Sequence, residues 1–322
     1  MKSIPLLPLL ALLALLAAAV PAPALAQEHA HAMHASAPLS AHDAEAQRAQ
    51  IEAVRAATER YRDHANAVKD GFRLFGQESP LMGEHWYRRD LVGESLDLRR
   101  PSTLQYANVG GRKVLVGVAY SIYRRPGEPL PEGFAGADDH WHTHDIARLA
   151  TAATADRPVL RWVVQRRIQK GKLGPGGRTL LTMVHAWVWS DNPDGTFALQ
   201  QRALPYLRAG LPAAWAARGD TASAEGIQLL APGACRGEVA RMDRLARLDS
   251  QQERALASAC EQHAARLRTL VGPDTGADAA NAAATRVWGG YLLSRGRILR
   301  PEQAARIQTV MAAAMEHDMT GM

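Results

Sequence analysis

Three histidines alternate with other residues in the run DDHWHTHD at positions 138–145. If this run is an extended strand, His140, His142 and His144 share one face, because successive side chains of a strand point to opposite sides. Neutral imidazoles are frequent ligands of transition metals, and three on one face are more typical of a metal site than of a core. For each histidine alone, a hydrogen-bonded surface position is the alternative. Together they predict a metal site.

Two histidines elsewhere in the chain are predicted to complete this site. His85 precedes a tryptophan, Trp86, and His185 lies in an apolar segment in which Trp187 and Trp189 would share its face. A buried imidazole needs a polar partner, since leaving it unpaired costs roughly 1–3 kcal/mol. A metal ion, a carbonyl or a carboxylate would each serve, and the neighbouring triple-histidine run favours the metal.

Carboxylates stand next to these histidines in the sequence. By accepting a hydrogen bond from the ring N–H, such groups fix the tautomer of a metal-binding imidazole, and one beside His85 could also act as a catalytic base. The four candidates are Glu84, Asp138, Asp139 and Asp145. Histidine ligands suit Zn, Cu, Ni or non-haem Fe, and the spacing does not distinguish these metals.

Both ends of the chain carry further groups that would bind metal loosely. They are His29, His31 and His34 near the N-terminus and Met315, His317 and Met319 near the C-terminus. Thioether and imidazole groups together suit copper ions. A polar leader without a role, and helix packing followed by a frayed end, are the alternatives.

The composition along the chain predicts five segments. A basic residue, an apolar run and the sequence Ala-Leu-Ala indicate a signal peptide at 1–26, so the mature protein is expected in the periplasm or secreted; an uncleaved anchor is the alternative. No later apolar run is long enough to span a membrane. The remaining segments are a flexible histidine-rich leader at 27–43, a helix at 44–70, a β-rich metal-binding domain at 71–203 and an α-helical domain at 204–322.

The region 71–203 alternates short apolar runs with Gly, Pro and Asp, which is typical of antiparallel strands. Apolar residues after position 204 instead recur at three- and four-residue steps, which predicts helices. We therefore expect an α+β fold: one helix, a small antiparallel β domain that is either open or barrel-like, and a helical bundle or hairpin domain. The expected strands are 103–107, 114–123, 140–144 and 182–190, with an inserted helix at 146–169.

Cys235 and Cys260 are the two cysteines of the chain. Helices are expected at 236–248 and 250–271, with a turn near Asp249. At ~1.5 Å rise per residue, an antiparallel hairpin of this kind brings the two cysteines to similar heights. Export permits disulfides, and one cysteine pair is a poor metal cage, so a structural disulfide is expected.

The net charge of +6 does not indicate nucleic-acid binding. The arginines are dispersed among acids, and no basic tract has interleaved aromatic residues. The chain also lacks a Gly-x-Ser-x-Gly elbow, a His-Glu-x-x-His helix and a phosphate-binding glycine loop. These absences argue against common hydrolase and nucleotide-binding classes and leave a metalloenzyme open.

Short elements across residues 70–200 resemble those of a group of exported bacterial proteins whose activity is not established. They comprise Gly-x-His-aromatic, Leu-x-Tyr, Val-Gly-Val-x-Tyr, Trp-His-x-His, His-Ala-Trp and Asn-Pro-x-Gly-x-Phe elements. Here they occur at residues 83–86, 104–106, 116–120, 141–144, 185–187 and 192–197. The resemblance implies a shared fold and supports a histidine site.

A second resemblance covers the C-terminal region. The sequences LDSQQ at 248–252 and LRPEQ at 299–303 are similar to the Leu-Thr-x-x-Gln elements of periplasmic stress chaperones and heavy-metal resistance sensors. Both copies lack the threonine. Physically each is a helix start: Asp249 or Ser250 can cap, and Pro301 fits the first helical position. The resemblance implies a helical hairpin with a periplasmic protein partner.

Three functions follow from these patterns. The first is a periplasmic protein that binds copper or a similar transition metal for sensing, sequestration or tolerance. The second is a metal-dependent enzyme, hydrolase or oxygenase-like, that uses the histidines of the β domain. The third is a chaperone-like helical module in which the histidines are structural.

Overall fold

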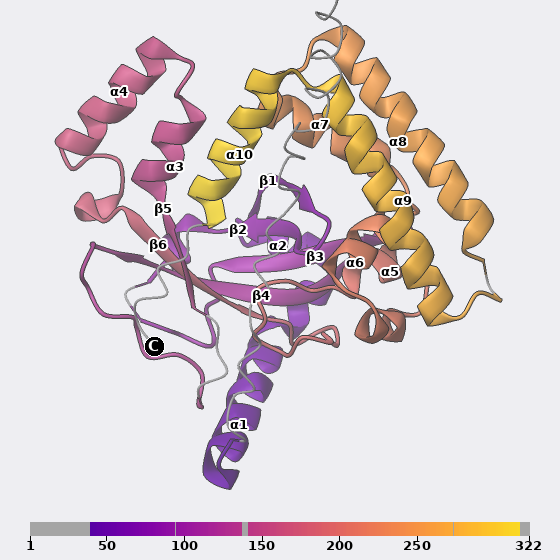
Figure 1. Cartoon of the computed structure of the whole chain (residues 1–322). Coiled ribbons are helices and arrows are strands. Elements are labelled where there is room, and N and C mark those ends of the chain that lie inside the picture. The colour runs from indigo at the N-terminus through magenta and orange to yellow at the C-terminus, as the bar shows by residue number, and fades with distance from the viewer. Residues whose placement is uncertain (1–38, 94, 137–140, 273, 316–322) are drawn as a thin grey trace, which may run out of the picture. The chain divides into compact units, whose positions relative to one another are not determined.

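The computed structural model describes residues 39–315 except 94, 137–140 and 273. The described residues form one compact unit of helices and sheet (Figure 1). No helix in the described part of the chain is long and apolar enough to cross a membrane. The predicted α+β class is confirmed.

In the described part of the chain, six strands form one antiparallel sheet in the order β1-β2-β3-β4-β6-β5. Both edges, β1 and β5, are open, so the barrel-like alternative is wrong. Their bounds are β1 (Arg73–Ser79), β2 (Gly83–Tyr87), β3 (Thr103–Val109), β4 (Arg112–Arg124), β5 (His142–Asp145) and β6 (Leu180–Ala186).

The N-terminal helices cover one face of this sheet. They are α1 (Ala41–Thr58), the 3-10 turn η1 (Glu59–Arg62) and α2 (His64–Lys69). Val54 and Ala67 from these helices share a buried core with Leu104 and Val118 of the sheet. The structure divides the helix predicted at 44–70, because Asp63 is extended and its side chain accepts the N–H of the next helix start, at Ala65.

The connection between β5 and β6 leaves the sheet as a pair of helices. The segment predicted as one helix at 146–169 forms α3 (Ile146–Ala153) and α4 (Pro158–Gln169). Pro158 starts the second helix, where its missing N–H costs nothing. Asp156 in the turn between them forms ion pairs with Arg247 and Arg306, which hold the pair against the C-terminal helices.

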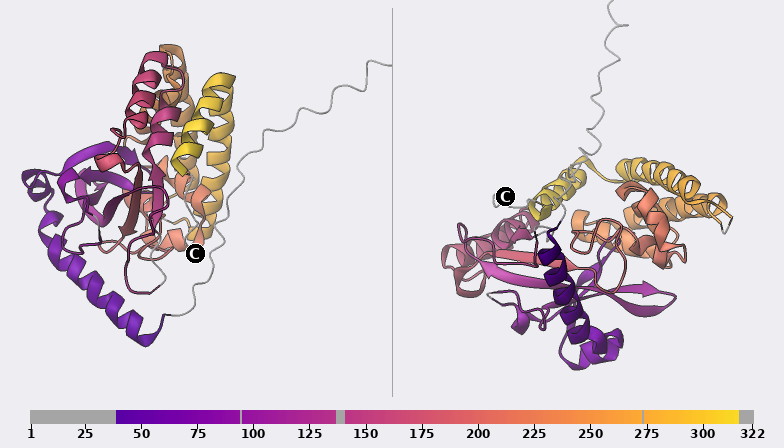
Figure 2. Two further views of the ribbon diagram at one scale, coloured as in Figure 1. Left: turned by 90° about the vertical axis from the view of Figure 1, so that its left-hand side faces the viewer. Right: turned by 90° about the horizontal axis from the view of Figure 1, so that it is seen from below.

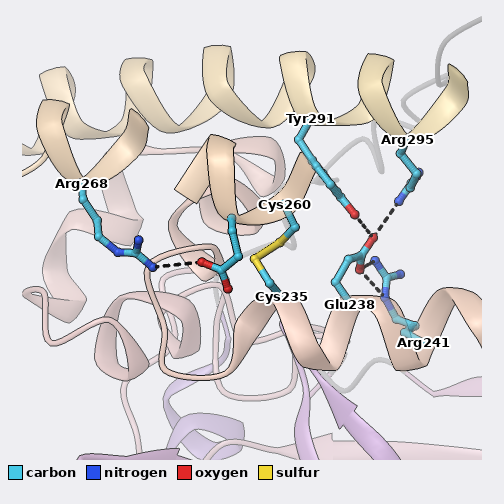
Figure 3. Close-up of a disulfide and its surroundings, with 8 residues drawn as sticks. Cys235, Glu238, Arg241, Cys260, Arg268, Tyr291 and Arg295 are labelled. Carbon is cyan, nitrogen blue, oxygen red and sulfur yellow. Dashed lines mark hydrogen bonds and ion pairs between the residues drawn. A yellow bond between two sulfur atoms is a disulfide. The ribbon is translucent and has the colours of Figure 1, made fainter. Parts of the chain in front are cut away.

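The C-terminal helices form a second core. They are α5 (Leu204–Arg208), η4 (Ala213–Arg218), α6 (Thr221–Gln228), α7 (Ala234–Ala246), α8 (Ser250–Leu270), α9 (Ala277–Ile298) and α10 (Pro301–Met315). The predicted disulfide is confirmed: Cys235 of α7 bonds to Cys260 of α8, with their Cα atoms 5.6 Å apart (Figure 3). Next to it, Glu238 accepts a hydrogen bond from Tyr291 Oη at 2.9 Å and pairs with Arg241 and Arg295.

The two elements LDSQQ and LRPEQ lie against each other. The side chains of Gln252 and Gln303 exchange two hydrogen bonds, of 2.7 and 3.0 Å, and both residues are buried. Each glutamine also accepts the backbone N–H of its own helix cap, Asp249 or Arg300, at 3.1 and 2.9 Å. The ion pair between Asp249 and Arg300 closes the arrangement. The N-termini of α8 and α10 are therefore linked to each other by the two glutamines and this ion pair, and we call this arrangement the interlocked helix start.

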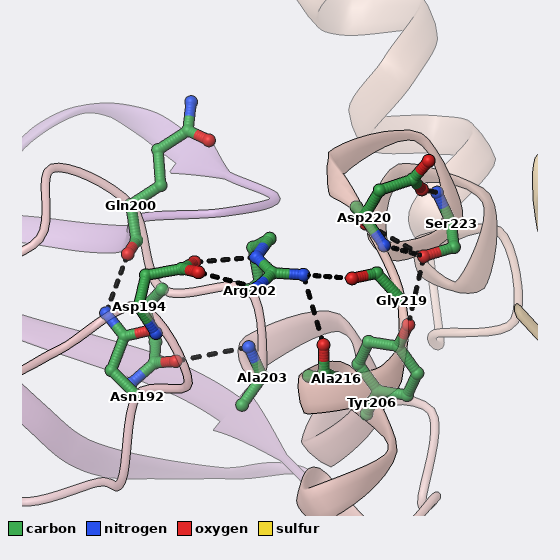
Figure 4. Close-up of polar contacts among 11 residues, drawn as sticks. Asn192, Asp194, Gln200, Arg202, Ala203, Tyr206, Ala216, Gly219, Asp220 and Ser223 are labelled. Atoms are coloured by element: carbon green, nitrogen blue, oxygen red, sulfur yellow. Dashed lines mark hydrogen bonds and ion pairs between the residues drawn. The ribbon is translucent and has the colours of Figure 1, made fainter. Parts of the chain in front are cut away.

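Arg202 joins the loop after β6 to these helices (Figure 4). Its guanidinium donates to both carboxylate oxygens of Asp194, at 2.6 and 2.5 Å, and to the carbonyl oxygens of Ala216 and Gly219. These hydrogen bonds anchor the loop that follows β6, the strand that carries His185, to the helical region.

Candidate metal centre

Four histidines from three strands converge on one face of the sheet, opposite the face covered by α1. His85 comes from β2, His185 from β6, and His142 and His144 from β5. The register explains the convergence, because directly paired residues share a face. His142 and His144 pair with Met183 and Leu181, which are two and four residues from His185 on β6.

The imidazole rings lie at separations that fit a shared metal ion. The ring centroid of His142 is 5.0 Å from that of His185 and 5.1 Å from that of His144, and His85 is 6.0 Å from His185. Two imidazoles that bind one ion at about 2.0–2.1 Å place their centroids roughly 5 Å apart. Among the described residues, no three His, Cys, Asp or Glu side chains already stand at metal-binding distances. Binding therefore requires rotation of the rings.

Small residues of the central strand make room for these rings. Gly117, Ala119 and Ser121 of β4 lie on the histidine face, where Ala119 pairs with His185. A Cβ atom at Gly117 would lie 2.8 Å from the ring of Trp187 and 3.3 Å from the side-chain oxygen of Gln105. A larger residue there would displace both.

Gly83 allows β2, the strand that carries His85, to approach the backbone of β3 closely. It has φ +67°, and a Cβ atom there would lie 2.5 Å from the carbonyl oxygen of Tyr106. Only glycine fits this backbone without strain. The close backbone approach places β2, and with it His85, beside β3.

Burial favours the neutral imidazole at His85 and His185. Desolvation, reinforced by the nearby His144, lowers the pKa of His85 to about 4. Desolvation lowers the pKa of His185 well below its ordinary range, and the imidazoles of His142, His85 and His144 add to the effect. His185 is only 1% exposed. Neutral imidazoles present the lone pairs that a metal needs, without first losing a proton.

Gln105 is a residue of this site that the sequence reasoning missed. It lies on β3 directly opposite His85, is fully buried, and places its Nε2 atom 2.9 Å from Nδ1 of His185. Its Oε1 atom is buried without a hydrogen-bond partner among the described residues. As placed, Nε2 also lies 3.4 Å from the carbonyl oxygen of Met82. A half-turn of the amide would instead place Oε1 against Nδ1, so that Nδ1 would carry the proton and Nε2 of His185 would be free to bind metal. Its position beside His85 depends on the pairing of β2 with β3, which no pattern in the sequence indicated.

Trp187 forms one wall of the site. Its ring stacks on that of His185 with centroids 5.6 Å apart, and its Nε1 donates to the carbonyl oxygen of Ala198 at 2.7 Å. Trp189, which was expected on the same face, instead donates from its indole to Thr58 of α1. The alternation stops because β6 ends at Ala186.

Glu84 and Trp86 are not brought to the histidines. Both lie on the opposite face of β2, where Glu84 accepts hydrogen bonds from Trp86 Nε1 at 2.9 Å and from Lys113 at 2.5 Å. Although burial alone raises the pKa of Glu84, these donors and Asn108 bring it below its ordinary value. Glu84 is therefore a paired carboxylate and does not serve as a base for this site.

Asp145 has a structural role. Its side chain accepts the N–H groups of Ala147 and Arg148 at 2.8 and 3.0 Å and so caps α3. Other predicted site residues lie outside the described part of the chain: His29, His31, His34, Asp138, Asp139, His140, His317 and Met319. Met315 is the last residue of α10, and its side chain is likewise not described.

Comparisons with known proteins found no relative of this chain. No protein-family model, curated protein or solved structure matches the chain. The candidate site is thus defined by its own geometry: four imidazoles and one amide on a single face of an open sheet.

Proposed function

We propose that the protein binds a transition-metal ion through an imidazole centre on the sheet. The ligands would be drawn from His85, His142, His144 and His185, with Gln105 orienting His185. The observation that carries the proposal is the convergence of four imidazoles from β2, β5 and β6, in which the neighbouring pairs His85–His185, His142–His185 and His142–His144 have ring centroids 5.0–6.0 Å apart. An all-imidazole set suits Cu, Zn, Ni or Fe and selects against Ca and Mg, which take oxygen ligands.

We further propose that the protein works outside the cytoplasm, in sensing, sequestration or tolerance of such a metal. The signal-like segment at 1–26 and the disulfide between Cys235 and Cys260 support this location, since disulfides persist in oxidising compartments. A site on a folded sheet suits specific retention of one ion.

Metal titration of the metal-free protein tests the proposal. We expect about one tightly bound equivalent of Cu²⁺ or Zn²⁺, as for a single four-ligand centre. The variant carrying His142→Ala and His185→Gln should lose this equivalent, because it removes two ligands.

A matched control removes two imidazoles from elsewhere. His64 packs on Trp86 at the other face of the sheet, and His263 bonds to Ser294 in the helical region. Both have pKa values that burial lowers, as in the cluster. The variant with His64→Ala and His263→Ala should keep the tight equivalent. Equal metal binding in both double variants, with circular dichroism showing that both fold, would refute the centre.

A further inference from the structure

The helix α4 exposes an unusual amount of apolar side chain. All twelve of its residues are described, and none is buried. Val159 is 74% and Trp162 60% exposed, and Leu160 and Val163 are exposed as well. Val159, Trp162, Val163 and Arg166 follow one another at three- and four-residue steps, so they form one outer face of the helix.

The same segment is strongly basic. Residues 157–172 contain six arginines and lysines and no Asp or Glu, and all six cations are exposed. None of the six forms an ion pair with a described residue. The guanidinium of Arg166 lies over the ring of Trp162, 5.3 Å from its centroid. Apolar and cationic groups are therefore mixed on one solvent-facing surface.

The position of α4 makes this surface accessible. The helix packs against α3, which separates it from α10, and it lies at the outer margin of the compact unit (Figures 1 and 2). Asp156 and its two arginine partners hold the start of the helix against the C-terminal region. The surface is thus presented on a fixed support.

We propose that α4 binds the surface of a bilayer that contains anionic phospholipids, with its axis parallel to that surface. The cations pair with lipid phosphates, while Trp162, Val159 and Val163 enter the boundary between headgroups and acyl chains. The exposed apolar residues favour a lipid surface over nucleic acid or an acidic peptide in solution. Acyl chains would contact Val159 and Leu160, whereas phosphate or carboxylate groups alone would not. This binding is independent of the metal centre.

Sedimentation with vesicles tests this proposal. A chain starting at residue 27 retains the compact unit and removes the apolar segment at 6–20, which would itself bind lipid. It should bind vesicles that contain phosphatidylglycerol and should not bind vesicles of pure phosphatidylcholine. Binding should weaken with salt, since salt screens exposed charges.

Two variants and their controls locate the contact. Arg166→Gln with Arg167→Gln should weaken binding by about 10- to 30-fold, and Trp162→Ser with Val159→Ser should weaken it to a similar degree. The matched controls are Arg254→Gln with Arg297→Gln, which are exposed cations of α8 and α9, and Phe75→Ser on β1. The controls should bind as well as the parent chain.

Three results would overturn the proposal. The first is no binding of the parent chain to anionic vesicles. The second is equal loss of binding in the control variants. The third is tighter binding to duplex DNA or to an acidic peptide than to vesicles, with the same dependence on Arg166 and Arg167.

Discussion

Buried polar groups are treated differently on the histidine face of the sheet and in the region of α7 to α10. In the helical region, two prominent buried groups have partners of matching charge or shape: Glu238 has Tyr291 and two arginines, and Gln252 has Gln303. On the sheet, the groups that act on the pKa of His185 are all imidazoles. Burial, together with these neighbouring imidazoles, lowers the pKa of His185.

This difference helps to distinguish buried polar groups that stabilise the fold from those that could bind a ligand. A closed set of donors and acceptors stabilises the fold and needs nothing further. In a cluster of imidazoles, a metal ion is a partner that several side chains could share. The predictions below test whether the two regions are separable.

The largest expected effect is on the helical region alone. Replacing Cys235 and Cys260 by serine opens a bridge between residues 25 apart and should lower the free energy of unfolding by about 3–4 kcal/mol. Denaturant titration measures this loss. Tight metal binding at low temperature should remain, and its disappearance in a folded variant would show that the regions are coupled.

The next effect is on the sheet. Gln105→Leu removes the acceptor that orients His185 and should weaken metal binding about 10- to 100-fold. Gln105→Glu keeps an acceptor at the same distance and should retain most of the affinity. Competition with a chelator measures both. Equal affinity of Gln105→Leu and the parent protein would exclude an orienting role for the amide.

A smaller effect is expected for the amide pair. Gln252→Leu leaves the buried amide of Gln303 without its partner and should destabilise the protein by about 1–2 kcal/mol. Adding Gln303→Leu should cost less than a second equal increment, because the two residues interact directly. A double-mutant cycle by thermal unfolding measures the coupling, and strict additivity would contradict the interlocked helix start.

The effect that is smallest at neutral pH is a change in the pH dependence of stability. The pKa values of His85 and His185 are lowered in the folded protein, so both are neutral in either state above pH 6.5. Below this pH the unfolded chain binds protons that the folded protein does not, so stability falls from pH 6.5 toward about 4. His185→Gln should flatten this fall in the metal-free protein. Thermal unfolding at several pH values measures it, and parallel curves would contradict the assignment.

Much of the fold could be predicted because local signals are strong. Pro301 and Asp249 mark helix starts that the structure places as expected, and the turn before β4 contains two glycines with positive φ, Gly110 and Gly111. The order of the sheet could not be predicted, because β5 pairs with β6 across an insertion of two helices. No local pattern specifies that pairing.

The sequence predicted the histidines of the site better than it predicted the residues around them. Alternation within β5 places His142 and His144 together, and the same rule separates Glu84 from His85, since adjacent residues of a strand face opposite sides. Gln105 could be recognised only from the register between β2 and β3, which is a tertiary property.

The central claim is that imidazoles of the sheet form one metal centre, and electron paramagnetic resonance of the protein loaded with Cu²⁺ tests it most directly. We expect one species with about four imidazole nitrogens around copper, and loss of at least one of them in His142→Ala. The spectrum should not change in the variant with His64→Ala and His263→Ala. Copper held by oxygen ligands, or an unchanged spectrum in His142→Ala, would contradict the centre.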